Sequence, residues 1–155
     1  NAIYRAGGTD VPVTDGGTGS STAATARTAL GVPYASQANM EASAANVVVT
    51  PDVQHFHPAM PKAWGRVAAD GTLGASHNVT SAAKNATGDY TITLTTAMAD
   101  TAYAVICSCI TSTRARYAAA TAPASSSAFS VFTSNSGNAD PSDQAFAFVV
   151  FGDMA

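Results

Sequence analysis

Hydrophobic and polar residues alternate most regularly in the C-terminal two thirds of the chain. Tyr90, Ile92 and Leu94 alternate with three threonines, which is typical of a strand with one buried face. Similar short segments recur between turn residues and predict about seven strands, at residues 63–69, 75–82, 89–95, 102–111, 114–121, 128–133 and 145–151. Short strands at this spacing predict a mainly β fold, an antiparallel β-sandwich or open barrel, and we expect the sandwich.

The first fifty residues follow a helical pattern instead. After a glycine-rich turn, Ser20 or Ser21 can cap an alanine-rich helix, and Gly31 stands where such a helix would end. A second helix is predicted over residues 36–44. Neither has a broad apolar stripe, so both must pack on other chains or on the domain that follows.

The organisation that follows is a neck at residues 1–50, with two short helices, and a β head at residues 51–155. Val47–Val49 reads as a strand stopped by a proline, close to the boundary. Because the chain starts at Asn1, we expect it to be a fragment of a longer polypeptide.

The chain carries few charges. Asp, Glu, Lys and Arg make up 11% of its residues, against about 25% in an average soluble domain. So few charges leave a small monomer poorly protected against association, which indicates an oligomer. A net charge of −3, with scattered Lys and Arg, argues against nucleic acid as a partner. No apolar run reaches the about 18 residues of a membrane-spanning helix.

Two cysteines, Cys107 and Cys109, stand two residues apart in a predicted strand. This spacing places both on one face, at the far limit of the distance that a disulfide can bridge. We expect two small core residues, with intermolecular bridging or redox chemistry as alternatives.

Histidines offer one candidate metal site. An extended His55-Phe-His57 segment would put both imidazoles on the same side. One chain alone makes a poor site, but three chains around an axis would supply six imidazoles, an octahedral shell suited to iron or another divalent transition metal. Packing or hydrogen bonding is the favoured alternative. His77 is isolated and receives no role.

Catalytic signals are sparse. The chain has one glutamate, Glu41, in the predicted neck, and no G-x-S-x-G motif, so we expect no enzyme. Asp140 and Asp143 could form a glycosidase pair or ligate calcium, but turn formation explains them better. Trp64, the single tryptophan, is expected to seal the head onto the neck, with sugar stacking as the alternative.

Arg114 and Arg116, with Tyr117 on the opposite side, offer guanidinium groups for phosphate or carboxylate on a glycan. The solvated face of an edge strand is the favoured alternative.

Three segments in order resemble the distal part of bacteriophage tail fibres: GGTG…AR…LG within residues 13–32, HP-x-x-x-KAW within 53–67, and GDYT followed by M-x-D-x-x-YAV within 88–105. The resemblance implies an intertwined homotrimer at the distal end of the virion's tail fibre, joined to the rest of the fibre or the baseplate. In some such fibres His-x-His pairs bind iron on the trimer axis, which would assign His55 and His57 as metal ligands, with iron as the cofactor.

The implied function is non-catalytic, multivalent adsorption to the host. The partner would be a bacterial surface polysaccharide, lipopolysaccharide or outer-membrane protein. A structural fibre or collar segment is one alternative, and a polysaccharide depolymerase is another. Contact residues are expected on loops remote from the neck, at residues 111–117, 122–127 and 134–144. The candidates are Arg114, Arg116, Tyr117, Asn135 and Asn138.

Overall fold

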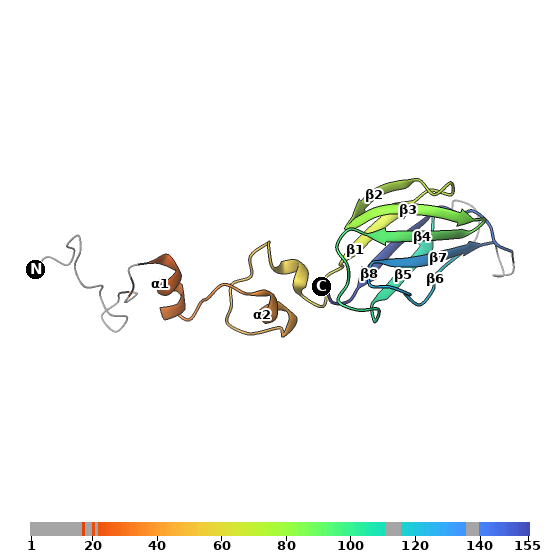
Figure 1. Ribbon diagram of the computed structural model, residues 1–155. Helices are drawn as coiled ribbons and strands as arrows, with labels where there is room; N and C mark the ends of the chain where they lie inside the picture. The colour runs from red at the N-terminus through yellow and green to blue at the C-terminus, as the bar shows by residue number, and fades with distance from the viewer. Residues whose placement is uncertain (1–16, 18–19, 21, 111–115, 136–139) are drawn as a thin grey trace, which may run out of the picture. The chain divides into compact units, whose positions relative to one another are not determined.

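The computed structural model describes residues 17, 20, 22–110, 116–135 and 140–155, and it divides the chain into two compact units. The first unit is residues 1–57 and the second is residues 58–155 (Figure 1). We describe each by itself. The division falls between His57 and Pro58, seven residues after the boundary predicted from the sequence.

The first helix, α1 (Ala23–Ala29), begins at Thr22. The Thr22 hydroxyl accepts a hydrogen bond from the Thr25 N–H at 3.2 Å, so the expectation that Ser20 or Ser21 caps the helix is wrong. The end of the helix is as predicted. Gly31 has a φ of 71°, and the Val32 N–H donates back to the Arg27 carbonyl at 2.9 Å, which together form a Schellman motif.

The second helix, α2 (Gln37–Glu41), is shorter than the predicted 36–44. Ser36 and Asn39 form a reciprocal capping box at its start. It stops early because Ser43 and Asn46 both have positive φ angles, 50° and 61°, which a right-handed helix cannot contain.

Val47–Val49 forms no strand. Val48 makes a single parallel bridge to Tyr34, and its neighbours have no further partner among the described residues. A run of β-branched residues is not enough for a strand when no neighbouring segment supplies the ladder of hydrogen bonds. A short 3₁₀ helix, η2 (Gln54–Phe56), follows. The described helices of the chain are all too short to cross a membrane.

The described residues of the second unit, which we call the head, form eight strands in two antiparallel four-stranded sheets. One sheet has the order β2-β1-β8-β5, and the other has the order β3-β4-β7-β6. The strands are β1 (Ala63–Val67), β2 (Leu73–His77), β3 (Val79–Ala86), β4 (Asp89–Leu94), β5 (Ala104–Cys109), β6 (Tyr117–Ala120), β7 (Ala128–Ser134) and β8 (Phe146–Phe151). The mainly β prediction is confirmed.

One predicted strand, 75–82, is two strands in different sheets. The break is Asn78, whose φ of 56° turns the chain out of β2 and into β3. Its side-chain amide donates to the carbonyls of Lys62 and Thr96, both at 3.1 Å. Its amide oxygen accepts from the Thr96 N–H at 2.7 Å. Asn78 therefore holds the corner at which the chain changes sheet.

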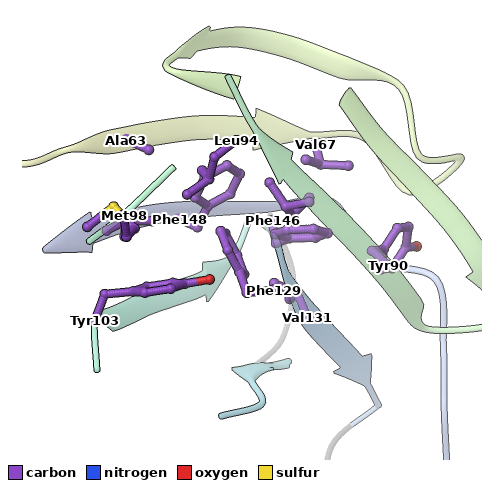
Figure 2. Packing of buried hydrophobic residues seen from close by; sticks show 12 residues of the cluster. Ala63, Val67, Tyr90, Leu94, Met98, Tyr103, Phe129, Val131, Phe146 and Phe148 are labelled. Atoms are coloured by element: carbon purple, nitrogen blue, oxygen red, sulfur yellow. The ribbon is translucent and has the colours of Figure 1, made fainter. Parts of the chain in front are cut away.

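Both sheets contribute to one hydrophobic core. Figure 2 shows the rings of Phe129, Phe146 and Phe148 gathered between the strands that carry them. Phe129 lies edge-on to Phe148 at 5.3 Å between ring centroids, and Tyr90 lies edge-on to Phe146 at 5.1 Å, both favoured aromatic geometries. The buried Tyr90 hydroxyl donates to the Ala69 carbonyl at 2.8 Å, so its polar end is satisfied.

The cysteines lie where the pattern predicts. Cys107 and Cys109 occupy the inward positions of β5, both are free thiols, and Cys107 packs against the core. Burial raises the pKa of both thiols, which keeps them protonated and weakly reactive at neutral pH. The prediction of a small core residue is confirmed for Cys107, whereas Cys109 is partly buried on the same side of the strand.

Candidate functional site

The predicted contact residues that the structure describes lie together at one end of the head. Arg116 immediately precedes β6 and Asn135 immediately follows β7, and these strands are paired through Tyr117 and Ser134. The Arg116 guanidinium donates a hydrogen bond to the Asn135 side-chain oxygen. Arg114 and Asn138 lie outside the described residues.

An exposed aromatic pair stands beside this contact. Tyr117 is 49% exposed and Phe132 is 46% exposed. Phe132 pairs with Ala119, two residues beyond Tyr117 on the same strand, so both rings stand on the outward side of the sheet as diagonal neighbours. The sequence analysis missed Phe132. The sequence does indicate that Phe132 is exposed, because alternation along β7 places Phe129 and Val131 inward and therefore Phe132 outward.

Polar side chains border the pair on its other side. Asp89 is the register partner of Phe132 across β4 and β7, so the carboxylate lies next to the ring. The Asn85 amide donates to the Thr91 hydroxyl at 2.8 Å, and it lies 3.4 Å from the Asp89 carboxylate. We call this outward side of the sheet the polar face; its members are Asn85, Asp89, Thr91, Tyr117, Ser130 and Phe132.

A shallow groove continues the polar face toward the other end of the strands. Its volume is about 190 Å³, less than the roughly 300–1,000 Å³ of enclosed small-molecule sites. Hydroxyl groups and small apolar groups line it: Thr91, Thr121, Ala124, Ser125, Ala128, Phe129 and Ser130. A groove of this kind suits an extended polar ligand that lies along the surface.

Asp143 has a structural role close to the polar face. Its carboxylate accepts from the Lys84 ammonium group at 2.6 Å and from the Gly88 N–H at 2.8 Å. The Lys84 hydrogen bond, followed by that of Gly88, lowers the pKa of Asp143. These contacts tie the segment before β8 to the β3–β4 turn and support turn formation over a ligand role. The backbone carbonyl of Asp140 accepts from the Asn135 N–H at 3.1 Å.

The histidine pair does not have the expected extended conformation. His55 lies within the 3₁₀ helix η2 and His57 directly follows it, so the alternation argument for two imidazoles on one side is wrong. The described part of the chain contains no group of three or more His, Cys, Asp or Glu residues arranged to hold a metal ion. The six-imidazole site with iron requires three chains and stays a prediction.

Trp64 stands on the outward side of β1 and is 45% exposed. Its indole stacks loosely on His77, its register partner in β2, at 6.5 Å between ring centroids and an interplanar angle of 21°. His77 thus has a neighbour that the sequence did not indicate. The expected contact of Trp64 with the neck stays a prediction.

One predicted contact loop, residues 122–127, lies at the groove end of the polar face. Residues 122–127 adjoin Met98, whose N–H donates to the Ser126 carbonyl at 2.8 Å. Met98 also bridges to Met154, just after β8. This is the end of the head at which β1 begins and β8 finishes. Strand β7 finishes at the opposite end of the head, so the predicted contact loop 134–144 starts there.

No protein-family model, curated protein or solved structure matches this chain.

Proposed function

We propose that the chain is the distal part of a bacteriophage tail fibre and that its head binds a glycan on the bacterial surface. In this proposal the two sheets form a β-sandwich tip on a helical neck, and three chains assemble as a homotrimer at the end of the virion's tail. The motif resemblance along the chain suggests the class of protein. The polar face is the single observation that carries the function.

The chemistry of the polar face suits sugars. A pyranose ring presents apolar C–H groups on its faces and hydroxyl groups around its edge. The Tyr117 and Phe132 rings offer apolar surface to the C–H faces of the sugar. Hydrogen-bonding groups for its hydroxyls come from Asp89, Asn85 and Thr91. Arg116 adds a cation beside the aromatic pair, which would favour a glycan that carries carboxylate or phosphate groups.

The shallow groove implies weak binding at each site. A shallow site leaves much of its ligand in water and therefore contributes little free energy per sugar. Three sites on one fibre tip would bind a repetitive polysaccharide with an avidity about 10²–10⁴ above that of a single site. Repetitive surface glycans are the partner for which such a design works.

The test is binding of the full chain to an array of bacterial capsular polysaccharides and lipopolysaccharides. We expect the wild type to bind at least one glycan, Phe132→Ala to lose that binding, and Phe132→Tyr to keep it because the ring remains. A structural fibre segment would bind none. A depolymerase would release new reducing ends from the polysaccharide it binds, and we expect none.

A further inference from the structure

Three hydroxyl-bearing residues form a row across the sheet, next to the exposed aromatic pair. Thr91 is the register partner of Ser130 across β4 and β7. The Thr121 N–H, just past β6, donates to the Ser130 carbonyl at 3.0 Å, so Thr121 continues the row on the other side of β7. Ser130 is two residues from Phe132 on the same strand, and alternation therefore places both side chains outward. We call Thr91, Ser130 and Thr121 the hydroxyl row.

The hydroxyl row lines the shallow groove, together with Ala124, Ser125, Ala128 and Phe129. None of the described residues that line the groove carries a charge. The guanidinium of Arg116 lies at the other end of the polar face, one residue before β6 and bonded to Asn135. The outward side of this sheet therefore has two parts: a cationic and aromatic end, and an uncharged end lined by hydroxyl and small apolar groups.

The wall of the groove is fixed from inside the head. The buried Tyr103 hydroxyl donates to the carbonyls of Ser125 and Ala128, both at 3.0 Å. The Leu94 N–H donates to the Ser127 carbonyl at 2.8 Å. These bonds hold residues 125–128 in one arrangement before any ligand binds, so a ligand that enters the groove has to order little of the protein.

We propose that the groove is a second sugar subsite, which takes an uncharged sugar of a linear glycan whose neighbouring sugar lies on Tyr117 and Phe132. Two residues along β7 separate Phe132 from Ser130, a distance of about 7 Å. This is close to the length of one pyranose unit in an extended chain. Adjacent sugars of a glycan that runs parallel to β7 therefore reach the aromatic pair and the hydroxyl row together. The inference rests on the proposed function, because it concerns the same ligand.

The hydroxyl row determines how much a longer ligand gains. Each Ser or Thr hydroxyl can donate one hydrogen bond and accept others, which matches the hydroxyl groups of an uncharged sugar. One such bond changes an affinity by about two- to tenfold. A single sugar on the aromatic pair does not reach the row, whereas a chain of two or more sugars does. The structure thus predicts that affinity rises with the length of the ligand.

The test measures the affinity of the full chain for fragments of the best-binding polysaccharide of the array, by calorimetric titration. The fragments are its monosaccharides and a trisaccharide, prepared by partial acid hydrolysis. Ala124→Trp fills the groove at an exposed position. Ser130→Ala removes the central hydroxyl of the row. Ser81→Ala is its matched control, because it removes an exposed hydroxyl from β3 of the same sheet, outside the groove.

We expect the trisaccharide to bind the wild type at least about tenfold more tightly than any of the monosaccharides. Ala124→Trp should remove that gain, so that the trisaccharide binds no better than a monosaccharide. Ser130→Ala should weaken trisaccharide binding about two- to tenfold, and Ser81→Ala should leave it unchanged. Far-UV circular dichroism verifies that each variant is folded.

Two kinds of result overturn the inference, and they have different meanings. A wild type that binds no glycan of the array removes the proposed function, and this inference with it. The other result keeps the proposed function, because the wild type binds and Phe132→Ala does not, but rejects the groove as a subsite. In that case the trisaccharide binds the wild type no better than a monosaccharide, or binds Ala124→Trp as tightly as the wild type.

Discussion

Replacing Phe146 with alanine should destabilise the head severely. The side chain is fully buried, with ring centroids 5.1 Å from Tyr90 and 6.4 Å from Phe148. Removing a buried Phe side chain costs about 3–5 kcal/mol, from lost transfer free energy and the cavity that remains. A head of this size has a free energy of unfolding of about 5–15 kcal/mol, so the substitution removes about a fifth of it or more.

The measurement is thermal and urea unfolding followed by far-UV circular dichroism, at one fixed protein concentration because association would contribute to stability. Each kcal/mol lowers the melting temperature of a domain this size by about 4–8 °C, so Phe146→Ala should lower it by at least about 12 °C. Phe132→Ala is the matched control. That ring is 46% exposed, and we expect a loss of about 1 kcal/mol or less. Equal losses for the two variants would refute the division into inward and outward faces.

Two further predictions concern the turn between β3 and β4. Gly88→Ala should destabilise the head by more than the about 1–2 kcal/mol of left-handed strain, because a Cβ at Gly88 would lie 2.4 Å from the Thr133 carbonyl oxygen and φ is 70°. Gly31 has a φ of 71°, but no atom lies within 4 Å of a Cβ built there, so Gly31→Ala should cost only the left-handed backbone strain. Equal urea midpoints for Gly88→Ala and Gly31→Ala would contradict the expected difference. The pKa of Asp143 in the folded head lies below its value in the unfolded chain. Its carboxylate therefore stabilises the head above about pH 4. That stabilisation is lost as the pH falls through the folded-state pKa. Asp143→Asn should therefore be less stable than the wild type at pH 7 and show a smaller loss of stability between pH 5 and pH 2; an unchanged acid slope would show that the Lys84–Asp143 pair contributes nothing.

The local part of the fold could be read from the sequence. Strand β4 was predicted almost to the residue because its two faces have different environments, so Tyr90, Ile92 and Leu94 alternate with threonines. The end of α1 was predicted because Gly31 carries a conformation that glycine adopts without strain. These signals depend on neighbours within a few residues.

Features that depend on distant contacts could not be read in this way. The break at Asn78 exists because its amide bonds to Lys62 and Thr96, sixteen and eighteen residues away. Val47–Val49 has a strand-like composition, but no partner pairs with it along its length. The predicted arrangement of His55 and His57 was wrong for a related reason. It assumed an extended backbone, whereas Gln54–Phe56 forms a 3₁₀ helix.

The candidate site was only half predicted. Arg116, Tyr117 and Asn135 were selected as polar or aromatic residues in predicted loops, and the structure brings them together. Phe132 was treated as one more hydrophobic residue of a strand, although its position in the alternation marks it as outward. Alternation indicates that Phe132 is outward, but placing its ring diagonal to Tyr117 requires the register between β6 and β7, which the sequence of one chain does not provide.

The central claim is that the head binds a glycan through the polar face. The most direct measurement is calorimetric titration with a short oligosaccharide released from the best-binding polysaccharide of the array. The proteins to compare are the wild type, Phe132→Ala and Phe132→Tyr. The account predicts that Phe132→Ala does not bind, whereas Phe132→Tyr keeps the wild-type affinity because the ring remains. Unchanged binding by Phe132→Ala would contradict it.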